Sequence, residues 1–247
     1  MSLKEKILFS WSGGKDSALA LHKVLQSGRY EVVALLTTVA DVYKRISHHG
    51  VREELLEMQA EALGLPLEKV YLPLSSGLPC TNQQYEEIIG SALAKFHDQG
   101  VRTVAHGDIY LQDLREYRER NLARIGMQGL FPIWHRDVRE LMQTFIDLGF
   151  RAYLCCVEGQ KLDSSFAGRA INRELLEDLP ADVCPCGENG EYHSFVYDGP
   201  IFQRPVDVHV GTVVCRDNHY YADLLPGGSD AESAQREPAK ESVYPPI

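Results

Sequence analysis

Apolar runs and stretches of helical periodicity alternate along the first two thirds of the chain. The continuous apolar runs lie at 7–9, 32–36, 70–72 and 152–157, and a further strand-like segment lies at 101–105. The stretches with apolar residues at helical spacing lie at 18–25, 53–63, 85–96, 114–125 and 138–148. Apolar strands that alternate with amphipathic helices are typical of a parallel sheet covered by helices on both faces. The pattern therefore predicts an α/β fold with a doubly wound, Rossmann-like parallel sheet.

The pattern changes after about Gly159. A helical stretch at 171–179 precedes β-rich segments at 192–197, 206–215 and 219–224, and Asp217-Asn218 has the composition of a hairpin turn between the last two. We expect a smaller C-terminal α+β lobe that closes over the first domain. The expected division is a larger domain at 1–158, the smaller lobe at 159–225 and a disordered tail at 226–247, which has few core residues.

The composition is that of an ordinary globular protein, with 44% hydrophobic and 24% charged residues. No apolar run approaches the length of a membrane-spanning helix, and the N-terminal residues run directly into the first strand, so we expect no signal peptide. Without a secretion signal we expect reduced thiols and a cytoplasmic protein. The six cysteines are Cys80, Cys155, Cys156, Cys184, Cys186 and Cys215.

The formal net charge of −10 argues against a broad contact with nucleic acid, which usually needs a basic face. The densest basic cluster lies at 115–124, where four arginines alternate with Glu116 and Glu119. Two interpretations stay open for Arg115, Arg118, Arg120 and Arg124. They either form charge pairs on a solvated helix, or some of them face phosphates or an acidic substrate.

The segment Ser12-Gly13-Gly14-Lys15-Asp16-Ser17 separates the first apolar run from the first helical stretch. Two glycines allow a tight turn and a close approach of the backbone to an anion, which the N–H groups of the following helix can bind. Lys15 adds a cation, and Ser12 and Ser17 add hydroxyl donors. The spacing is not that of a Walker A loop. It resembles the SGGxDS loop of the PP-loop ATP pyrophosphatases, which split ATP between the α and β phosphates.

Two other polar segments have candidate chemistry. His106-Gly107-Asp108 follows the run at 101–105, where a glycine permits close approach and a carboxylate can hold Mg²⁺ on ATP, although Asp108 could instead only cap the next helix. The segment 186–195, CGENGEYHSF, brings two glycines, two carboxylates and an amide together before a predicted strand. It either binds an amine, ammonium or a polar substrate, or it is a surface turn.

Three cysteine and histidine groups have weaker signals. The spacing of Cys184-Pro185-Cys186 is not usual for zinc, so we predict no metal there and assign the pair no role. Cys155 and Cys156 lie in an apolar run and are predicted core residues. His48 and His49 are predicted to be solvated or locally hydrogen-bonded unless their surroundings make them ligands.

In this order, the motifs resemble one PP-loop family, the diphthine–ammonia ligase (diphthamide synthase, ATP-binding) family. The resemblance runs from about Lys6 to Phe202 and rests mainly on 187–195, because many PP-loop enzymes share the SGGKDS loop. His49-Gly50, Pro132-Ile133-Trp134 and 198–202 add to it. The resemblance implies a nucleotide-binding domain of the PP-loop/HUP type at 1–158 and a substrate-binding lobe at 159–225.

The resemblance also implies a reaction. Enzymes of this family adenylate a carboxylate with ATP and Mg²⁺, release pyrophosphate, and let ammonia displace AMP to form an amide. Carried over to this sequence, it implies Lys15, Glu188 and Glu191 as catalytic residues, and His49, Asn189 and Tyr192 at the acceptor. The implied ATP-binding residues are Ser12, Gly13, Gly14, Lys15, Asp16, Ser17, Thr37, Gly107 and Asp108, with Asp108 contacting Mg²⁺ through ATP.

One departure from the family pattern leaves the acceptor open. The form typical of the diphthamide enzymes reads closer to GEGGEYET, whereas here Asn189 replaces the middle glycine and His193-Ser194 replaces Glu-Thr. The acceptor is then diphthine or another carboxylate, on a protein side chain or on a small molecule. No glutaminase segment is visible, so free ammonia or a partner would supply the nitrogen. A homodimer is compatible with the sequence.

Two alternatives in other functional classes remain at this stage. A PP-loop enzyme that thiolates tRNA would normally need a redox cysteine pair and a basic surface, and neither is clear in this sequence. A non-catalytic adenine-nucleotide-binding protein would keep the loop at 12–17 but would not need Glu188 and Glu191. The nucleotide product, AMP or ADP, would separate these possibilities.

Overall fold

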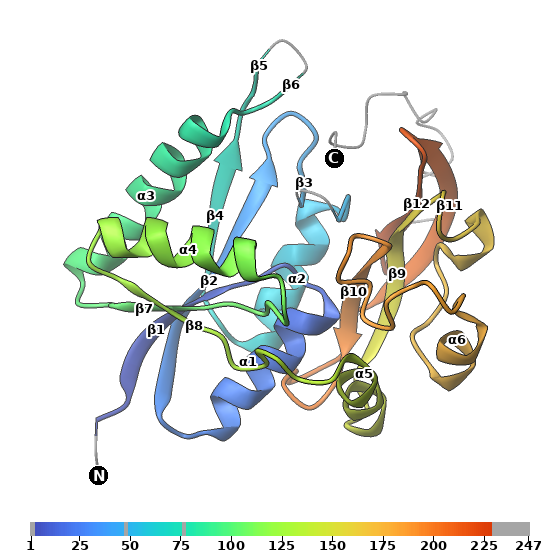
Figure 1. The fold of residues 1–247 in the computed structure, drawn as a ribbon, viewed down its shortest axis with the longest axis horizontal. Helices are drawn as coiled ribbons and strands as arrows, with labels where there is room; N and C mark the ends of the chain where they lie inside the picture. Colours follow the sequence, from blue (N-terminus) through green and yellow to red (C-terminus); the bar gives the residue numbers. More distant parts are fainter. Residues whose placement is uncertain (1–2, 47–48, 76–77, 229–247) are drawn as a thin grey trace.

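The computed structural model describes residues 3–46, 49–75 and 78–228. The larger lobe is built on a six-stranded sheet (Figure 1). Its parallel strands pair in the order β4-β2-β1-β7-β8, and the short β3 pairs antiparallel with the end of β2. The expected parallel sheet is thus confirmed. The strands are β1 (Glu5–Ser10), β2 (Tyr30–Ala40), β3 (Arg45–Ile46), β4 (Leu67–Leu72), β7 (Thr103–Ala105) and β8 (Gln128–Leu130).

Helices cover both faces of this sheet, because successive side chains of a strand point to opposite faces. In β1, Ile7 and Phe9 pack into the core that includes α1, α2 and α5, whereas Leu8 packs against α3 and α4. Figure 1 shows α3 and α4 together on one face. The helices are α1 (Lys15–Gln26), α2 (Glu53–Leu63), α3 (Asn82–Asp98), α4 (Gln112–Arg124) and α5 (Val138–Asp147).

Local signals fix several helix ends. Thr81 and Gln84 form a capping box, in which each side chain accepts a hydrogen bond from the backbone N–H of the other, so α3 begins at Asn82 rather than at Tyr85. The carboxylate of Asp137 accepts hydrogen bonds from N–H groups in the first turn of α5. Gly64 ends α2 in the left-handed conformation, with φ of 68°. Beyond β4, the two-residue strands β5 (Leu74–Ser75) and β6 (Leu78–Pro79) form a small hairpin before α3.

The strand order reverses next to β1. The chain runs from β1 outward to β2 and β4, and then returns to place β7 on the other side of β1. This reversal leaves a crevice at the carboxyl ends of the two central strands, where open α/β sheets bind ligands. The loops at 12–17 and 106–108 follow β1 and β7, so both sequence motifs lie at the switch point.

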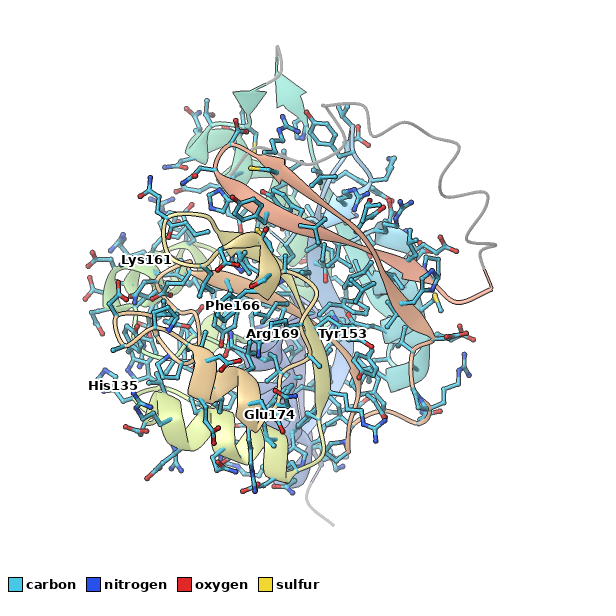
Figure 2. All side chains as sticks on the ribbon, turned by 90° about the vertical axis from the view of Figure 1, so that its right-hand side faces the viewer. His135, Tyr153, Lys161, Phe166, Arg169 and Glu174 are labelled. Atoms are coloured by element: carbon cyan, nitrogen blue, oxygen red, sulfur yellow. The ribbon has the colours of Figure 1, made fainter. Side chains whose placement is uncertain are left out.

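The smaller lobe is built on a four-stranded antiparallel sheet of order β10-β9-β12-β11. The strands are β9 (Arg151–Glu158), β10 (Tyr192–Asp198), β11 (Val208–Arg216) and β12 (His219–Pro226). Asp217 and Asn218, at φ of 47° and 62°, form the expected turn between the last two strands. Figure 2, which looks onto this lobe, shows the chain that includes Phe166 and Arg169 beside β9. That chain contains the 3₁₀ turn η1 (Ser164–Phe166), and α6 (Arg173–Asp178) follows it and is shorter than the predicted 171–179.

One sequence expectation is corrected by this sheet. The run at 152–157 was expected in the parallel sheet, but it forms β9 and pairs antiparallel with β10 and β12. Its apolar pattern misled because a strand buried on both faces has the same pattern in either kind of sheet. A boundary at residue 158 would separate β9 from its partners, so we propose a boundary between β8 and β9.

Other expectations concern the cysteines, the membrane and the tail. All six cysteines are free thiols, and Cys155 and Cys156 are buried in the core as predicted. Within the described ranges, no helix combines the length and the apolar character needed to cross a bilayer. The predicted tail begins at the end of β12, and its residues 229–247 lie outside the described part of the chain.

Candidate active site

A cavity of about 930 Å³ opens at the switch point of the parallel sheet. Its walls come from the loops after β1, β2 and β7, from α3 and α4, and from the segment 187–194. The predicted residues that line it are Ser12, Gly14, Lys15, Asp16, Ser17, Thr37, His49, Gly107, Asp108, Glu188 and Tyr192. The tertiary fold therefore brings the two strongest sequence motifs, which lie more than 170 residues apart along the chain, into one site.

The loop at 12–17 is held from both lobes. Gly13 has φ of 78°, and a Cβ at this position would lie 2.6 Å from Oε1 of Gln59, so only glycine fits. The Gly13 carbonyl accepts hydrogen bonds from the N–H of Val196 in β10 (2.9 Å) and from Nε2 of Gln59 (3.0 Å). The Lys15 N–H donates to Oγ of Ser194, also in β10, at 3.1 Å. The strand of the smaller lobe thus fixes the loop that we expect to bind phosphate.

Lys15 is a buried cation with a specific set of neighbours. Its Nζ lies 2.9 Å from Oδ2 of Asp16 and 4.9 Å from the centre of the Tyr192 ring. Burial works against the charge, but Asp16, and then Tyr192 and Cys186, outweigh it and raise the pKa of Lys15, while burial raises the pKa of Asp16 itself. Tyr192 is fully buried and donates its hydroxyl hydrogen to the Pro185 carbonyl. Lys15 is therefore a permanent positive charge at the start of α1.

Glu188 faces the same cavity. Its Oε1 accepts a hydrogen bond from the Ile109 N–H at 3.1 Å. The Glu188 side chain therefore links the segment 186–195, which we call the signature loop, to the chain after β7. Burial, and then the negative charge of Asp16, raise the pKa of Glu188 to about 7. A carboxyl group with this pKa can both accept and release a proton near neutral pH, as a general base must.

Glu191 and Asn189 are placed differently from Glu188. The Glu191 carboxylate is buried and accepts hydrogen bonds from the backbone N–H groups of Cys184 and Asn189, both at 2.9 Å, and from the Asn189 side chain at 3.0 Å. Burial acts to raise its pKa, but these donors outweigh burial and the pKa of Glu191 lies below its usual value. The hydrogen bonds of both side chains therefore hold the conformation of the loop that carries Glu188.

The segment 106–108 joins the phosphate loop to α4. A Cβ at Gly107 would lie 2.9 Å from backbone atoms of Asp16 and Ser17, so glycine permits the contact with the first turn of α1. Asp108 pairs with Arg118, with Nε–Oδ2 of 2.8 Å and Nη2–Oδ1 of 3.2 Å. His106 is buried and stacked on Phe131, and within the described ranges neither ring nitrogen has a hydrogen-bond partner. Burial, and then the charge of Arg118, hold the pKa of His106 well below its usual range.

Thr37 and His49 complete the far wall of the cavity. The Thr37 hydroxyl donates to the Trp11 carbonyl at 2.5 Å, which ties the end of β2 to the loop after β1. The His49 ring lies 4.7 Å from the His193 ring, and its Nδ1 lies 3.3 Å from the Ser194 carbonyl. A carbonyl can only accept, so Nδ1 carries the proton in this contact. His49 is thus locally hydrogen-bonded, as predicted, and also lines the cavity, so its role at the acceptor stays a prediction.

The carboxylates of the cavity fit a magnesium ion that arrives with a nucleotide. Mg²⁺ in such sites takes one or two protein carboxylates together with phosphate oxygens and waters. Among the described residues, no group of three acidic, histidine or cysteine side chains could hold a metal by itself. Oδ1 of Asp16 and Oδ2 of Asp108 are both buried with no hydrogen-bond partner in that part of the chain, and each carboxylate is paired with a cation, Lys15 or Arg118. The two carboxylates therefore fit this ion alike, and the contact of Asp108 with Mg²⁺ stays a prediction.

Several site residues were not predicted as such. Gln59 was assigned to the apolar face of a helix, but it is fully buried and links Trp11, Gly13 and Val196 through its amide. A polar residue at a core position of a helical pattern was the signal. Arg118 belonged to the ambiguous basic cluster and is the arginine in it that lines the cavity, whereas Arg115, Arg120 and Arg124 pair with glutamates.

Comparison with known proteins agrees with the resemblance in the sequence. The diphthamide synthase N-terminal domain model matches residues 5–129 and the C-terminal domain model matches 137–223. The chain is 27% identical over 233 residues to the diphthine–ammonia ligase of Danio rerio, covering 86% of this chain and 90% of that protein. It is 25% identical over 242 residues to the human diphthine–ammonia ligase, covering 86% of each. The proposed domain boundary after β8 falls near the gap between the two models.

A solved structure also aligns with this chain. It is a predicted subunit of a tRNA methyltransferase from Methanocaldococcus jannaschii, with a TM-score of 0.42 and 16% identity over 79% of this chain and 98% of that one. The family assignment does not depend on it, because the N-terminal model alone extends over half of the sequence and the C-terminal model follows in order. The chain belongs to the diphthamide synthase family.

Proposed function

We propose that this protein is an ATP-dependent ligase that joins ammonia to a carboxylate through an acyl-adenylate. The observation that supports this most is that one cavity contains both the phosphate loop and Glu188. A phosphate loop alone would fit any nucleotide-binding protein. A carboxyl group with a pKa of about 7 beside that loop adds the proton acceptor that ammonia chemistry needs.

In the first proposed step, a carboxylate oxygen of the acceptor attacks the α-phosphorus of ATP, and the bond to the pyrophosphate breaks. Negative charge develops on the phosphate oxygens in the transition state. Lys15 and the N–H groups at the start of α1 stabilise that charge, because they are fixed before the reaction begins. When bound, Mg²⁺ would neutralise phosphate charge, and Asp16 and Asp108 are the carboxylates of the cavity that would hold it.

The ligand must displace two hydrogen bonds at this loop. The Lys15 N–H now donates to Oγ of Ser194, and the Gly14 N–H to Oγ of Ser12 at 3.2 Å. A phosphate oxygen accepts more strongly than a hydroxyl. We therefore propose that ATP takes over these N–H groups and leaves both serine hydroxyls free to donate to the same phosphate.

In the second proposed step, ammonia attacks the acyl carbon, and AMP leaves with the pair of electrons of the broken C–O bond. Ammonium must lose a proton to become a nucleophile, and the amide nitrogen must lose another. Glu188 is proposed to accept a proton from the ammonium ion. Glu191 and Asn189 would position the loop of Glu188 rather than contact the substrates, since both are bonded within that loop.

The acceptor is a carboxylate, and diphthine is the one indicated by the names of the relatives. The test incubates the protein with ATP, ammonium and diphthine, or with other carboxylates, and separates the nucleotides by chromatography. We expect AMP and pyrophosphate, in amounts equal to the amide formed. ADP as the main product would contradict the proposal. AMP formation without amide, in the presence of ammonium, would contradict the ligase step alone.

A further inference from the structure

The cavity has a second region that the nucleotide chemistry does not use. It extends from the phosphate loop into the space between α3 and α4, and we call this region the α3–α4 arm. The residues that define it are Tyr85, Ile89 and Leu93 of α3, Leu114, Arg118 and Leu122 of α4, and Val104 and His106 of β7 and the residue after it. Sites for small molecules usually measure about 300–1,000 Å³, so a cavity of about 930 Å³ has room for a second ligand beside a nucleotide.

The arm has an apolar wall. Tyr85, Ile89 and Leu93 recur every four positions on α3, and Leu114, Arg118 and Leu122 do so on α4. Each helix therefore presents one stripe to the arm, which is apolar apart from the Tyr85 hydroxyl and Arg118, and Tyr117 and Asn121 of α4 also line the cavity. Leu93, Val104 and Leu122 are buried members of the core on this face of the sheet, whereas Ile89 is only partly buried. An apolar wall with a few well-placed polar groups is the usual construction of a small-molecule site.

Arg118 supplies the charge in this arm. A guanidinium has five N–H donors, of which Nη2 donates to Oδ1 of Asp108, whereas the contact of Nε with Oδ2 is an ion pair without hydrogen-bond geometry. The remaining donors can bind a second carboxylate, and Asp108 holds the side chain in position for it. The positive charge of Arg118 also acts on Tyr85 and His106, which places the guanidinium among the arm residues of both helices and of β7.

His106 places an uncharged imidazole ring in the wall of the arm. Burial beside a cation keeps its imidazole uncharged, so it has one N–H donor and one acceptor nitrogen. Among the described residues neither nitrogen has a partner, and a buried polar atom without a partner is costly. Both nitrogens are also shielded from the cavity, so His106 adds an uncharged ring to the wall of the arm rather than a hydrogen bond to a ligand.

The arm ends next to the reacting groups. Arg118 is paired with Asp108, and the preceding residue, Gly107, packs against the first turn of α1. Asp108 also acts on Glu188 through its charge. A carboxylate bound by Arg118 would therefore lie in the same cavity as the phosphate loop and Glu188, the proposed base for ammonia.

We propose that the α3–α4 arm is the acceptor site, and that it takes a carboxylate with an apolar body. The carboxylate binds Arg118, and the apolar body lies against Ile89, Leu93 and Leu122, with the uncharged ring of His106 in the same wall. This proposal rests on the proposed function only in taking the acceptor to be a carboxylate. An adenine base fits the arm less well, because it has no negative charge to pair with Arg118.

The test measures octanoate binding by calorimetry, with butyrate as the short-chain probe and α,β-methylene-ATP as the nucleotide probe. Wild type should bind octanoate at least ~10-fold more tightly than butyrate, because each buried CH₂ adds about a factor of four. Arg118→Gln should weaken octanoate binding about 10-fold or more, because a charge-assisted contact is lost. Ile89→Trp should abolish octanoate binding by filling the arm. Ile89→Trp should keep nucleotide affinity within about threefold, since Ile89 contacts neither the phosphate loop nor Asp108. Arg118→Gln leaves Asp108 without its partner, so nucleotide affinity is compared for Ile89→Trp alone.

Matched controls lie on the same helices. Ala94→Trp adds the same ring to an exposed position of α3, and Arg124→Gln removes an exposed arginine of α4 that pairs with Glu86. Both should bind octanoate as wild type does. Thermal unfolding checks that Ile89→Trp is folded, and Ile89→Phe replaces it if it is not.

Two outcomes would overturn the proposal. If wild type does not bind octanoate, or if Arg118→Gln and Ile89→Trp bind it normally, the arm is not a carboxylate site. If a folded Ile89→Trp loses nucleotide binding together with octanoate, the arm belongs to the nucleotide. Failure of wild type to bind the nucleotide probe would instead contradict the proposed function and leave the octanoate result independent.

Discussion

The two ends of the cavity are built in opposite ways. The phosphate end is a contiguous loop, polar throughout, whose backbone is bonded to Gln59 and to the β10 strand of the other lobe. The α3–α4 arm is mostly apolar and is assembled from side chains of two helices and one strand. Backbone N–H groups at a helix start bind any phosphate in the same way, whereas side chains on helices can differ without changing the fold. The first construction suits a common co-substrate and the second suits a particular acceptor.

Glu188 should show the largest effect, because it lies where the two ends meet. Glu188→Gln keeps the size of the side chain and removes the proton acceptor. We expect amide formation to fall about 10²–10⁴-fold, the usual contribution of a general base, while nucleotide binding stays unchanged. Single-turnover assays that follow adenylate and amide separately measure this. In wild type the amide step should rise with pH through about 7, as Glu188 loses its proton, and this inflection should vanish in the variant.

Lys15→Met tests the phosphate end alone. The loss of a fixed cation at the developing phosphate charge should slow AMP formation by about 10²–10³-fold and weaken nucleotide binding. Octanoate binding in the arm should not change. Weaker nucleotide binding with unchanged octanoate binding would show that the two ends of the cavity bind their ligands independently. Lys23→Met, in the last turn of the same helix, is the control. Normal AMP formation by Lys15→Met would show that the ammonium is structural.

The stability of Glu188→Gln tests whether the buried, ionised carboxylate of Glu188 lowers the free energy of unfolding. The pKa of Glu188 rises from 4.5 in the unfolded chain to about 7 in the fold, so the folded state favours the protonated form. Wild-type stability should therefore fall as pH rises from about 4.5 to 7. The variant lacks this loss and should be more stable at pH 8, by up to about 3 kcal/mol, and equal at low pH. Urea unfolding at both pH values checks this, and an equal stability at pH 8 would contradict the raised pKa.

Glu191→Gln should have the smaller and opposite effect. The variant loses a charged acceptor of three hydrogen bonds inside the signature loop, and we expect a loss of about 1–3 kcal/mol in unfolding free energy at neutral pH. The folded pKa of Glu191 lies below its usual value, so this stabilisation is present above pH 4.5 and disappears as pH falls through the folded pKa. Urea unfolding at pH 7 and at acid pH measures both parts. Lost amide formation with unchanged stability would instead make Glu191 a substrate contact.

The sequence was sufficient for features whose cause is local. The strand, two glycines and helix around 12–17 required a tight turn at Gly13 whatever the rest of the fold, and the apolar alternation required a sheet with helices on both faces. The turn at Asp217-Asn218 was evident for the same reason. The order of the motifs was enough to indicate the family.

Features that depend on partners distant in the chain were decided only by the tertiary structure. The apolar run of β9 could not indicate which sheet it joins, because that depends on pairing with β10 and β12. Two glutamates three residues apart looked alike in sequence, yet Ile109 draws Glu188 to the cavity and the N–H groups of its own loop hold Glu191 away from it. Arg118 differs from its neighbouring arginines only because β7 places Asp108 opposite it. The burial and charge of a site depend on all the residues that the fold brings together. The spacing of residues in the sequence was therefore enough to predict the phosphate loop, whereas only packing determined which side chains form the proposed acceptor site in the α3–α4 arm.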